Sequence, residues 1–117
     1  MGNEVSFAGR HLLLDLWEAQ GLDQVPLVEK ALTDAVEACG ATLLDLRLHT
    51  FSSTGGISGV AIVAESHISI HTWPEWQYAA IDVFLCGTCD PNDAVPVFKA
   101  AFKPGRMQMM ESRRGMH

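Results

Sequence analysis

The residues most able to do chemistry lie close together between positions 64 and 76. Ser66 directly follows Glu65, and two histidines, His67 and His71, follow within the next five positions. A serine hydroxyl becomes a nucleophile when a nearby base takes its proton, and attack on its own chain also requires a strained backbone. We therefore interpret Ser66 as a nucleophile directed at the carbonyl of Glu65. A bend of the chain within this segment would allow His71 to serve as the base.

Attack by Ser66 would replace the peptide bond before it with an ester, by an N-to-O acyl shift. Loss of the α-proton of residue 66 would then expel the Glu65 carboxylate and leave a dehydroalanine, which hydrolyses to a pyruvoyl group. The chain would be cut between residues 65 and 66 and would carry its own electrophilic carbonyl. Such a carbonyl can act as a catalytic cofactor.

A structural interpretation of the same residues stays open. If residues 66–72 are extended, His67, Ser69 and His71 share one face of a strand. These polar side chains could then simply face solvent, since a lone histidine is more often structural or exposed than catalytic.

The sequence CGTC at residues 86–89 offers a metal site as a further alternative. Its two cysteines have the spacing of zinc ligands, and His67 and His71 could complete a set of four. Against zinc, Cys86 ends an apolar segment and the chain has no second cysteine pair. A thioredoxin-like redox pair is disfavoured as well, because that motif opens a helix, whereas this one leads to Asp90-Pro91.

Alternating or continuous apolar runs predict the strands that must position these residues. They cover residues 10–17, 44–49, 57–64, 66–72, 78–85 and 106–111. A helix is predicted over residues 28–39, where apolar residues recur at helical spacing between Pro26 and a capping Gly40. A second helix is predicted to start near Asn92 or Asp93, with an apolar face of Val97, Phe98, Ala101 and Phe102.

Strands interrupted by only two helices predict an α+β fold, a two-layer sandwich in which both helices pack on one face of a mainly antiparallel sheet. The chain has 117 residues, so we expect a single domain over residues 1–117. A domain of this size leaves much of its surface uncovered, which favours an obligate oligomer.

The composition argues against several classes of function. With a net charge of −6 and a pI near 5.2, the chain lacks the basic face that binding to nucleic acid requires. No apolar run approaches the roughly 20 residues of a membrane-spanning helix, and no apolar signal-peptide core is present. We therefore expect a cytoplasmic protein that binds neither membranes nor nucleic acid. Three cysteines without an export signal argue against a disulfide framework.

Five segments of the chain form a larger pattern: GRHL at 9–12, GAT at 40–42, ISGV at 57–60, AESHISIHTWPE at 64–75 and YAAIDVFLCG at 78–87. Over about residues 8–90, this pattern resembles the short prokaryotic S-adenosylmethionine decarboxylase proenzymes. The segment at 64–75 is its most specific part. The resemblance implies a pyruvoyl-dependent enzyme that decarboxylates S-adenosylmethionine to the aminopropyl donor for spermidine.

The resemblance also implies where the chain is cut. Glu65 and Ser66 match the residues on either side of the cleaved bond. Cleavage would leave a β chain of residues 1–65 and an α chain of residues 66–117, which begins with a pyruvoyl group derived from Ser66. In the family this group forms a Schiff base with the substrate amine and withdraws electrons as carbon dioxide departs. No metal is implied.

Other site residues are implied in the same way. His71 matches the histidine that removes the α-proton during processing, and Ser58 matches a second processing residue that helps to hold the reacting carbonyl. Cys86 matches the cysteine that returns a proton to the substrate carbon. Glu75 matches a carboxylate that binds the ribose hydroxyls, and Phe51 matches an aromatic that stacks on adenine. Family members dimerise with active sites where the protomers meet, so we expect a homodimer of processed αβ protomers.

This sequence departs from the family pattern at several positions. Phe51 lies seven residues before Ser58, where six is usual, and Asp15 stands where a glutamate is common. Trp76 replaces a usual tyrosine, and Cys89 lies outside the pattern. These differences bear on the choice of substrate more than on the chemistry.

Two alternative functions therefore stay open. Some relatives with the same pyruvoyl machinery decarboxylate arginine or ornithine, and both activities would use Ser66, His71 and Cys86 alike. A chain that no longer processes could instead serve as a partner subunit without catalysis. The complete processing set of Glu65, Ser66, Ser58 and His71 argues against that alternative.

Overall fold

Strands form in this chain where apolar side chains alternate with polar ones, because successive residues of a strand face opposite sides. The computed structural model describes residues 6–117. Its elements, in chain order, are β1 (Gly9–Trp17), α1 (Val25–Ala38), β2 (Leu43–Thr50), β3 (Ile57–Val63), β4 (Ser66–Trp73), the 3-10 turn η1 (Pro74–Trp76), β5 (Tyr78–Cys86), the 3-10 turn η2 (Pro91–Ala94), α2 (Val95–Phe102) and β6 (Arg106–Arg114).

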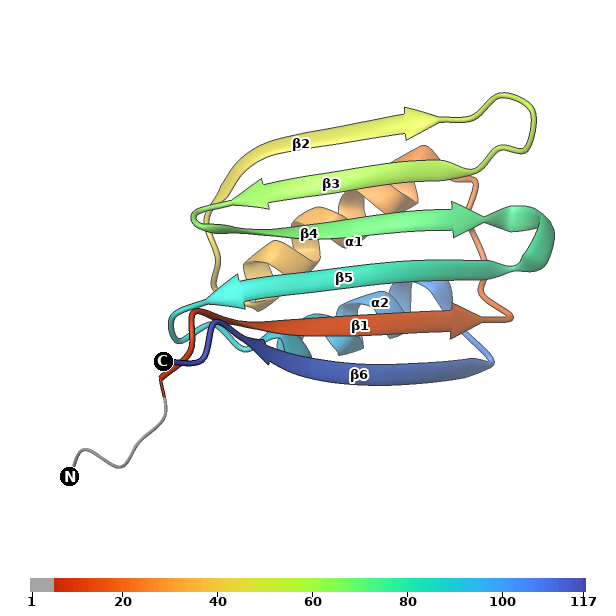
Figure 1. The fold of residues 1–117 in the computed structure, drawn as a ribbon. Coiled ribbons are helices and arrows are strands. Elements are labelled where there is room, and N and C mark those ends of the chain that lie inside the picture. Colours follow the sequence, from red (N-terminus) through yellow and green to blue (C-terminus); the bar gives the residue numbers. More distant parts are fainter. Residues whose placement is uncertain (1–5) are drawn as a thin grey trace.

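The strands of the described chain form one sheet of six in the order β2-β3-β4-β5-β1-β6, and every neighbouring pair is antiparallel. Figure 1 shows α1 and α2 lying together behind one face of this sheet. We call the opposite face the open face, since no described helix or strand covers it. The predicted α+β sandwich, with both helices on one face of an antiparallel sheet, is confirmed.

The hydrophobic core lies between the sheet and the helices. Every second residue of β5 is buried, so one row of its apolar side chains points toward the helices. From α2, Phe98 and Phe102 are fully buried, and their rings stack with centroids 6.4 Å apart. Burying a side chain of this size contributes about 1.5–3 kcal/mol. The other row of each strand is thereby directed to the open face, where the sequence places His67, Ser69 and His71.

The ends of α1 follow the signals in the sequence. Pro26 lies in the first turn, where its missing N–H costs no hydrogen bond. At the other end, Gly40 has a φ of 71°, and the N–H groups of Gly40 and Ala41 donate to the carbonyls of Glu37 and Val36. This is the left-handed glycine cap that the sequence predicted.

The start of α2 differs from the prediction. The helix begins at Val95 rather than near Asn92, because a separate 3-10 turn comes first. Asp90 caps that turn by accepting a hydrogen bond from the backbone N–H of Asn92 at 2.9 Å. Both Pro91 and Pro96 lack an N–H, so each opens a helical segment instead of continuing one.

The edge strand β2 also departs from its predicted alternation. A register shift between Leu43 and Asp45 marks a bulge, and Leu44 beside it is 64% exposed. Leu46 and Leu48 keep the predicted face and pack against the core. A bulge inserts one extra residue into a strand, so the alternation read from the sequence fails at that point.

Candidate active site

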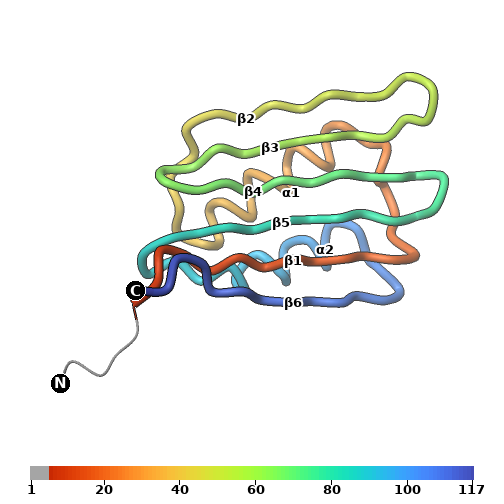
Figure 2. Tube along the Cα trace, in the orientation of Figure 1, coloured from red at the N-terminus to blue at the C-terminus, as the bar shows by residue number. Residues whose placement is uncertain are grey.

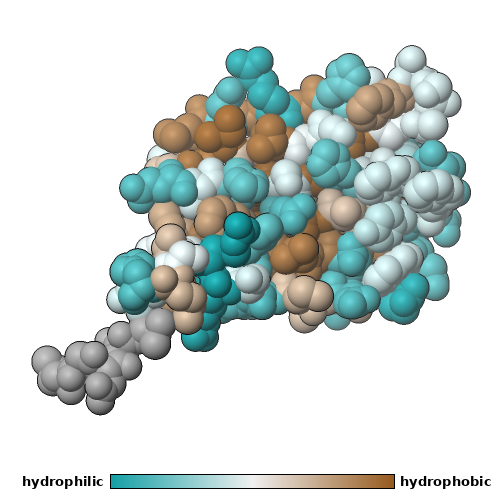
Figure 3. Space-filling model, in the orientation of Figure 1, coloured by the Kyte–Doolittle hydropathy of each residue, from teal (hydrophilic) through white to brown (hydrophobic). Residues whose placement is uncertain are grey.

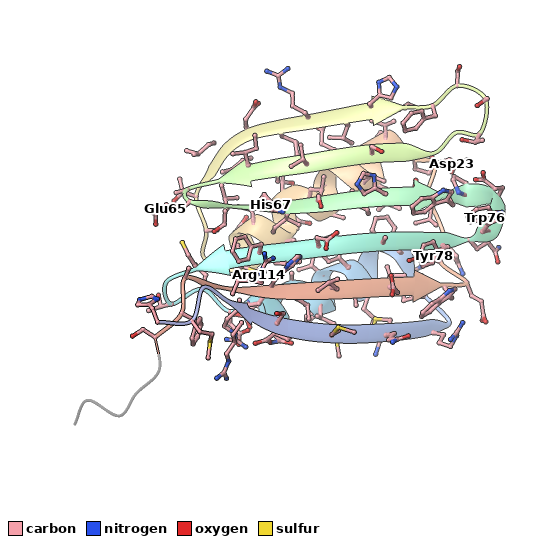
Figure 4. All side chains as sticks on the ribbon, in the orientation of Figure 1. Asp23, Glu65, His67, Trp76, Tyr78 and Arg114 are labelled. Carbon is pink, nitrogen blue, oxygen red and sulfur yellow. The ribbon has the colours of Figure 1, made fainter. Side chains whose placement is uncertain are left out.

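The turn between β3 and β4 holds the residue before the serine in a strained conformation. Val63 pairs with Ser66, so only Ala64 and Glu65 connect the two strands. Glu65 has a φ of 69°, in the left-handed region that favours glycine. For a residue with a Cβ atom this conformation costs about 1–2 kcal/mol. Figure 4 shows Glu65 at the tip of this turn, at one end of the sheet.

The hydroxyl of Ser66 is buried and unpartnered. Among residues 6–117, its Oγ is the one buried side-chain nitrogen or oxygen without a hydrogen-bond partner. An unpartnered buried polar group costs about 1–3 kcal/mol, and such groups are rare in folded proteins. A hydroxyl without other hydrogen bonds is available to react with the carbonyl next to it.

Cys86 lies beside the same bond. It is the last residue of β5, and its Sγ donates a hydrogen bond to Oε2 of Glu65 at 3.4 Å. Cys86, Glu65 and Ser66 line one cavity of about 260 Å³. The structure thus brings three of the predicted site residues together. We call Glu65, Ser66 and Cys86 the cleavage-end group.

Ser58 and His71 belong to a second group. They are paired across β3 and β4, and Oγ of Ser58 lies 2.9 Å from Nδ1 of His71. Both line a cavity of about 370 Å³ whose wall also includes Phe51, Trp73 and Glu75. The four remaining predicted site residues, Ser58, His71, Phe51 and Glu75, therefore lie together. We call them the histidine-end group.

Within one chain these two groups do not meet. β4 runs without a break from Ser66 to Trp73, and its pairing with β3 and β5 has no register shift. At about 3.3 Å per residue, the five steps from Ser66 to His71 span about 16 Å. The predicted bend that would bring His71 to Ser66 is wrong. Figure 2 shows the β3–β4 turn and the end of β5 at one end of the sheet, and the β2–β3 and β4–β5 connections at the other.

Aromatic residues that the sequence analysis did not assign extend the histidine-end group. Trp73 stacks on Trp76, with ring centroids 6.1 Å apart, and lies 5.3 Å from the ring of Tyr78. The hydroxyl of Tyr78 donates to Oδ1 of Asp15 at 2.6 Å. Burial, followed by this hydrogen bond, raises the pKa of Tyr78 to about 12. The available signal was the motif TWPE itself, in which Trp73 follows His71 on the same face of the strand.

The middle of the open face carries a hydrogen-bonded pair that the sequence analysis also missed. Nε2 of His11 lies 3.0 Å from Oδ1 of Asp82, across the β1–β5 pairing. Phe84 packs between His11 and His67, with ring centroids 5.6 Å and 6.0 Å away. The signal for these residues was their place at the outward-facing positions of otherwise apolar strands.

The metal-binding alternative finds no support in the described chain. Among residues 6–117, no three or more His, Cys, Asp or Glu side chains are grouped so that they could hold a metal ion. His71 of the proposed set lies far along β4 from Cys86, at the other end of the sheet. The same residues also include no helix that is long and apolar enough to cross a membrane.

Comparison with known proteins identifies the family. A family model described as S-adenosylmethionine decarboxylase matches residues 10–115. The chain is 50% identical over 109 residues to the S-adenosylmethionine decarboxylase proenzyme of Thermomicrobium roseum, which covers 92% of this chain and 94% of the relative. This chain belongs to the S-adenosylmethionine decarboxylase family.

Other family members agree with this assignment. The proenzyme of Methanococcus maripaludis is 50% identical over 111 residues, covering 92% of this chain and 90% of the relative. The proenzyme of Thermotoga petrophila is 42% identical over 112 residues, which cover 93% of this chain and 85% of the relative. The crystal structure of the adenosylmethionine decarboxylase from Aquifex aeolicus matches with a TM-score of 0.85 at 31% identity, covering 94% of this chain and 92% of that one. The family resemblance predicted from the sequence is confirmed.

Proposed function

We propose that this chain cuts itself between Glu65 and Ser66 and then acts as a pyruvoyl-dependent decarboxylase of S-adenosylmethionine. The main support for this proposal is the conformation and surroundings of the two residues that this bond joins. Glu65 is held in a left-handed conformation, and the next residue has a buried hydroxyl without a partner. The relatives are named proenzymes, which are chains that mature after synthesis.

Processing begins with attack of Oγ of Ser66 on the carbonyl carbon of Glu65. The strain at Glu65 favours this step, because it raises the energy of the intact chain and is released when the peptide bond breaks. A base must take the hydroxyl proton and later the α-proton of residue 66. His71 is suited to this role, since its Nδ1 already lies 2.9 Å from Ser58 and its ring is thereby oriented.

The surroundings of Ser66 fit the formation of a pyruvoyl group there, because its buried Oγ has no partner and shares a cavity with Cys86. Once formed, this group supplies an electron-withdrawing carbonyl that takes up electrons as carbon dioxide leaves the substrate. Cys86 then donates a proton to the substrate carbon. Its thiol is held beside the cleavage site by Oε2 of Glu65, at 3.4 Å.

The separation of about 16 Å between Ser66 and His71 supports a site that two copies of the chain share. We infer a symmetric homodimer in which the two open faces pack together and the strands of the two sheets run in opposite directions. A two-fold axis of this kind brings the histidine-end group of one subunit to the cleavage-end group of the other. Each dimer then has two complete sites. This arrangement uses every predicted site residue without bending β4.

The open face has the composition of a subunit interface. Alternation along the strands places Leu13, Ile62 and Met110 on it, and these side chains are 38%, 43% and 60% exposed. Figure 3 shows this face, with apolar side chains interspersed among polar ones. Its centre holds His11 and Asp82, which lie within hydrogen-bonding distance of each other in the same chain. Exposed apolar side chains on one face, with polar groups that already have hydrogen-bond partners in the same chain, are features of a surface that a second subunit can cover.

The cavity beside the histidine-end group favours S-adenosylmethionine as the substrate. Phe51 and Trp73 offer aromatic faces on which a purine ring can stack, and Glu75 offers a carboxylate for ribose hydroxyls. The volume of about 370 Å³ lies in the range of small-molecule sites. Arginine and ornithine carry neither an aromatic ring nor a ribose, so these residues would have no role in binding them.

Mass spectrometry of the denatured protein tests the processing step. We expect two chains, residues 1–65 and residues 66–117, with the second lighter than a serine-started chain by one ammonia. The Ser66→Ala variant should stay whole, whereas a matched Ser69→Ala variant on the same strand should be cut. Release of carbon dioxide from S-adenosylmethionine, arginine and ornithine, assayed in parallel, identifies the substrate. An uncut chain without release would contradict the proposal, and release from arginine alone would favour the second candidate.

Mixing two inactive variants tests the shared site. The His71→Ala chain should remain uncut when produced alone, and so should the Ser66→Ala chain. When both are produced together, a mixed dimer contains one complete site. In that site the His71→Ala chain supplies Ser66 and the Ser66→Ala chain supplies His71. We therefore expect the His71→Ala chain to be cut only in the mixture, with the product identified by mass. If it stays whole in the mixture, the two groups do not meet across the interface.

A further inference from the structure

Cys86 and Cys89 flank a tight turn at the end of β5. Gly87, with a φ of 67°, and Thr88 form this turn. In a four-residue turn the first and last Cα atoms lie within about 7 Å, and disulfides join Cα atoms about 4.4–6.8 Å apart. A Cβ atom placed on Gly87 would meet nothing within 4 Å. The outer side of the turn at Gly87 is therefore free of neighbouring atoms.

The two cysteines also share a cavity that solvent reaches. Cys86 and Cys89 are half-buried, are free thiols and line the same space of about 260 Å³ as Glu65 and Ser66. A small oxidant that enters this space meets both thiols.

The third cysteine, Cys39, lies near enough to Cys89 to be influenced by its charge, but it is the most buried of the three. Cys39 is 5% exposed at the end of α1. Burial, followed by the nearby charge of Asp93, raises the pKa of its thiol to about 11. Since the thiolate is the reactive form of cysteine, Cys39 reacts slowly with oxidants near neutral pH.

We propose that Cys86 and Cys89 form a reversible disulfide that switches the decarboxylase off. This inference rests on the proposed function, because it takes Cys86 as the proton donor. A sulfur held in a disulfide carries no proton, so the substrate carbon would not be reprotonated. Disulfides in short, exposed loops are labile and easily reduced, which suits a regulatory bond.

The oxidant we assign is a low-molecular-weight disulfide such as oxidised glutathione. One cysteine thiolate attacks a sulfur atom of the small disulfide and expels the first small thiolate, leaving a mixed disulfide. The other cysteine thiolate attacks the protein sulfur of that bond and expels the second. In total, Cys86 and Cys89 lose two protons and two electrons, and the small disulfide is reduced to two thiols.

Self-cleavage makes this proposal easy to test, because it separates the cysteines. Cys39 lies in the chain of residues 1–65, whereas Cys86 and Cys89 lie in the chain of residues 66–117. The processed enzyme is incubated with oxidised glutathione, denatured, blocked with N-ethylmaleimide and weighed. We expect residues 66–117 to lose two hydrogen atoms and take up no maleimide, while residues 1–65 take up one. Decarboxylation should be lost in parallel and restored by dithiothreitol.

Two variants serve as controls. Cys89→Ser should form no internal bond with oxidised glutathione and should instead retain a glutathione adduct on Cys86, which dithiothreitol removes. Cys39→Ala should form the internal bond as the unaltered protein does. A covalent link between the two chains would mean that Cys39 is the partner and would overturn the proposal. So would two free thiols in residues 66–117 after oxidation.

The same measurement separates failure of this inference from failure of the proposed function. If the chain does not process, the disulfide is read from the tryptic peptide of residues 48–99, which contains Cys86 and Cys89 but not Cys39. An internal bond in that peptide of an uncut, inactive chain would support the redox pair while refuting the enzyme. A processed, active enzyme whose activity survives full formation of the bond would refute the switch alone.

Discussion

The strain at Glu65 predicts that glycine and alanine at this position will differ in self-cleavage and in stability. Both substitutions remove the contact of Glu65 with Cys86, so the two variants differ only in a Cβ atom at a φ of 69°. Alanine keeps the left-handed penalty of about 1–2 kcal/mol, and glycine does not. If that strain is released during cleavage, Glu65→Gly should cut about five- to thirtyfold more slowly than Glu65→Ala.

Stability should change in the opposite direction. Glycine loses more conformational freedom on folding than alanine, by about 0.5–1 kcal/mol, and this cost offsets part of the relieved strain. The free energy of unfolding of Glu65→Gly should therefore exceed that of Glu65→Ala by roughly 0.5–1 kcal/mol. For a domain of this size it corresponds to roughly 2–4 °C in Tm. Thermal unfolding is measured with both variants in a Ser66→Ala background, so that every chain is intact.

The cleavage rate is measured by following the intact chain after synthesis, with mass spectrometry of samples denatured at intervals. The reasoning is refuted if the glycine variant is the more stable of the two but cuts as fast as the alanine variant. The strain would then be real without contributing to the reaction.

Three other perturbations have defined outcomes. Cys86→Ala should process normally but decarboxylate at least about a hundredfold more slowly, the usual cost of losing a general acid, as carbon dioxide release will show. Leu13→Asp places a charge on the open face, so light scattering should show a shift toward monomers. Self-cleavage should be lost with the dimer. Monomers that still cut themselves would contradict the shared site. The pKa of Tyr78 is raised from 10.0 to about 12, so its protonated hydroxyl contributes stability that is full below pH 10 and is lost as the pH rises toward 12. In thermal unfolding over that interval, Tyr78→Phe should remove this decline, and an unchanged decline would assign it to other groups.

Much of the fold could be predicted because its signals are local. Alternation along β4 and β5 and the proline and glycine that bound α1 depend on neighbours in the chain, and the structure agrees with them. The predictions failed at two places where the chain departs from the regular geometry of a strand or an α-helix. The bulge at Leu44 and the 3-10 turn before α2 each break a regular pattern without a distinctive sequence signal.

The candidate site was predictable in its residues but not in its geometry. By itself, the sequence determined which side chains could act, since Glu65 and Ser66 are adjacent and His71 follows in the same segment. Only the tertiary structure decided that Cys86 lies beside Glu65, which is 21 positions away in the sequence. The reason is that β5 pairs with β4 and finishes at the end of the sheet where the β3–β4 turn lies. The tertiary structure also decided that His71 lies about 16 Å from Ser66, since hydrogen bonding to strands on both sides keeps β4 extended. The left-handed Glu65 has the same origin, because a connection of two residues between paired strands leaves the backbone few other conformations.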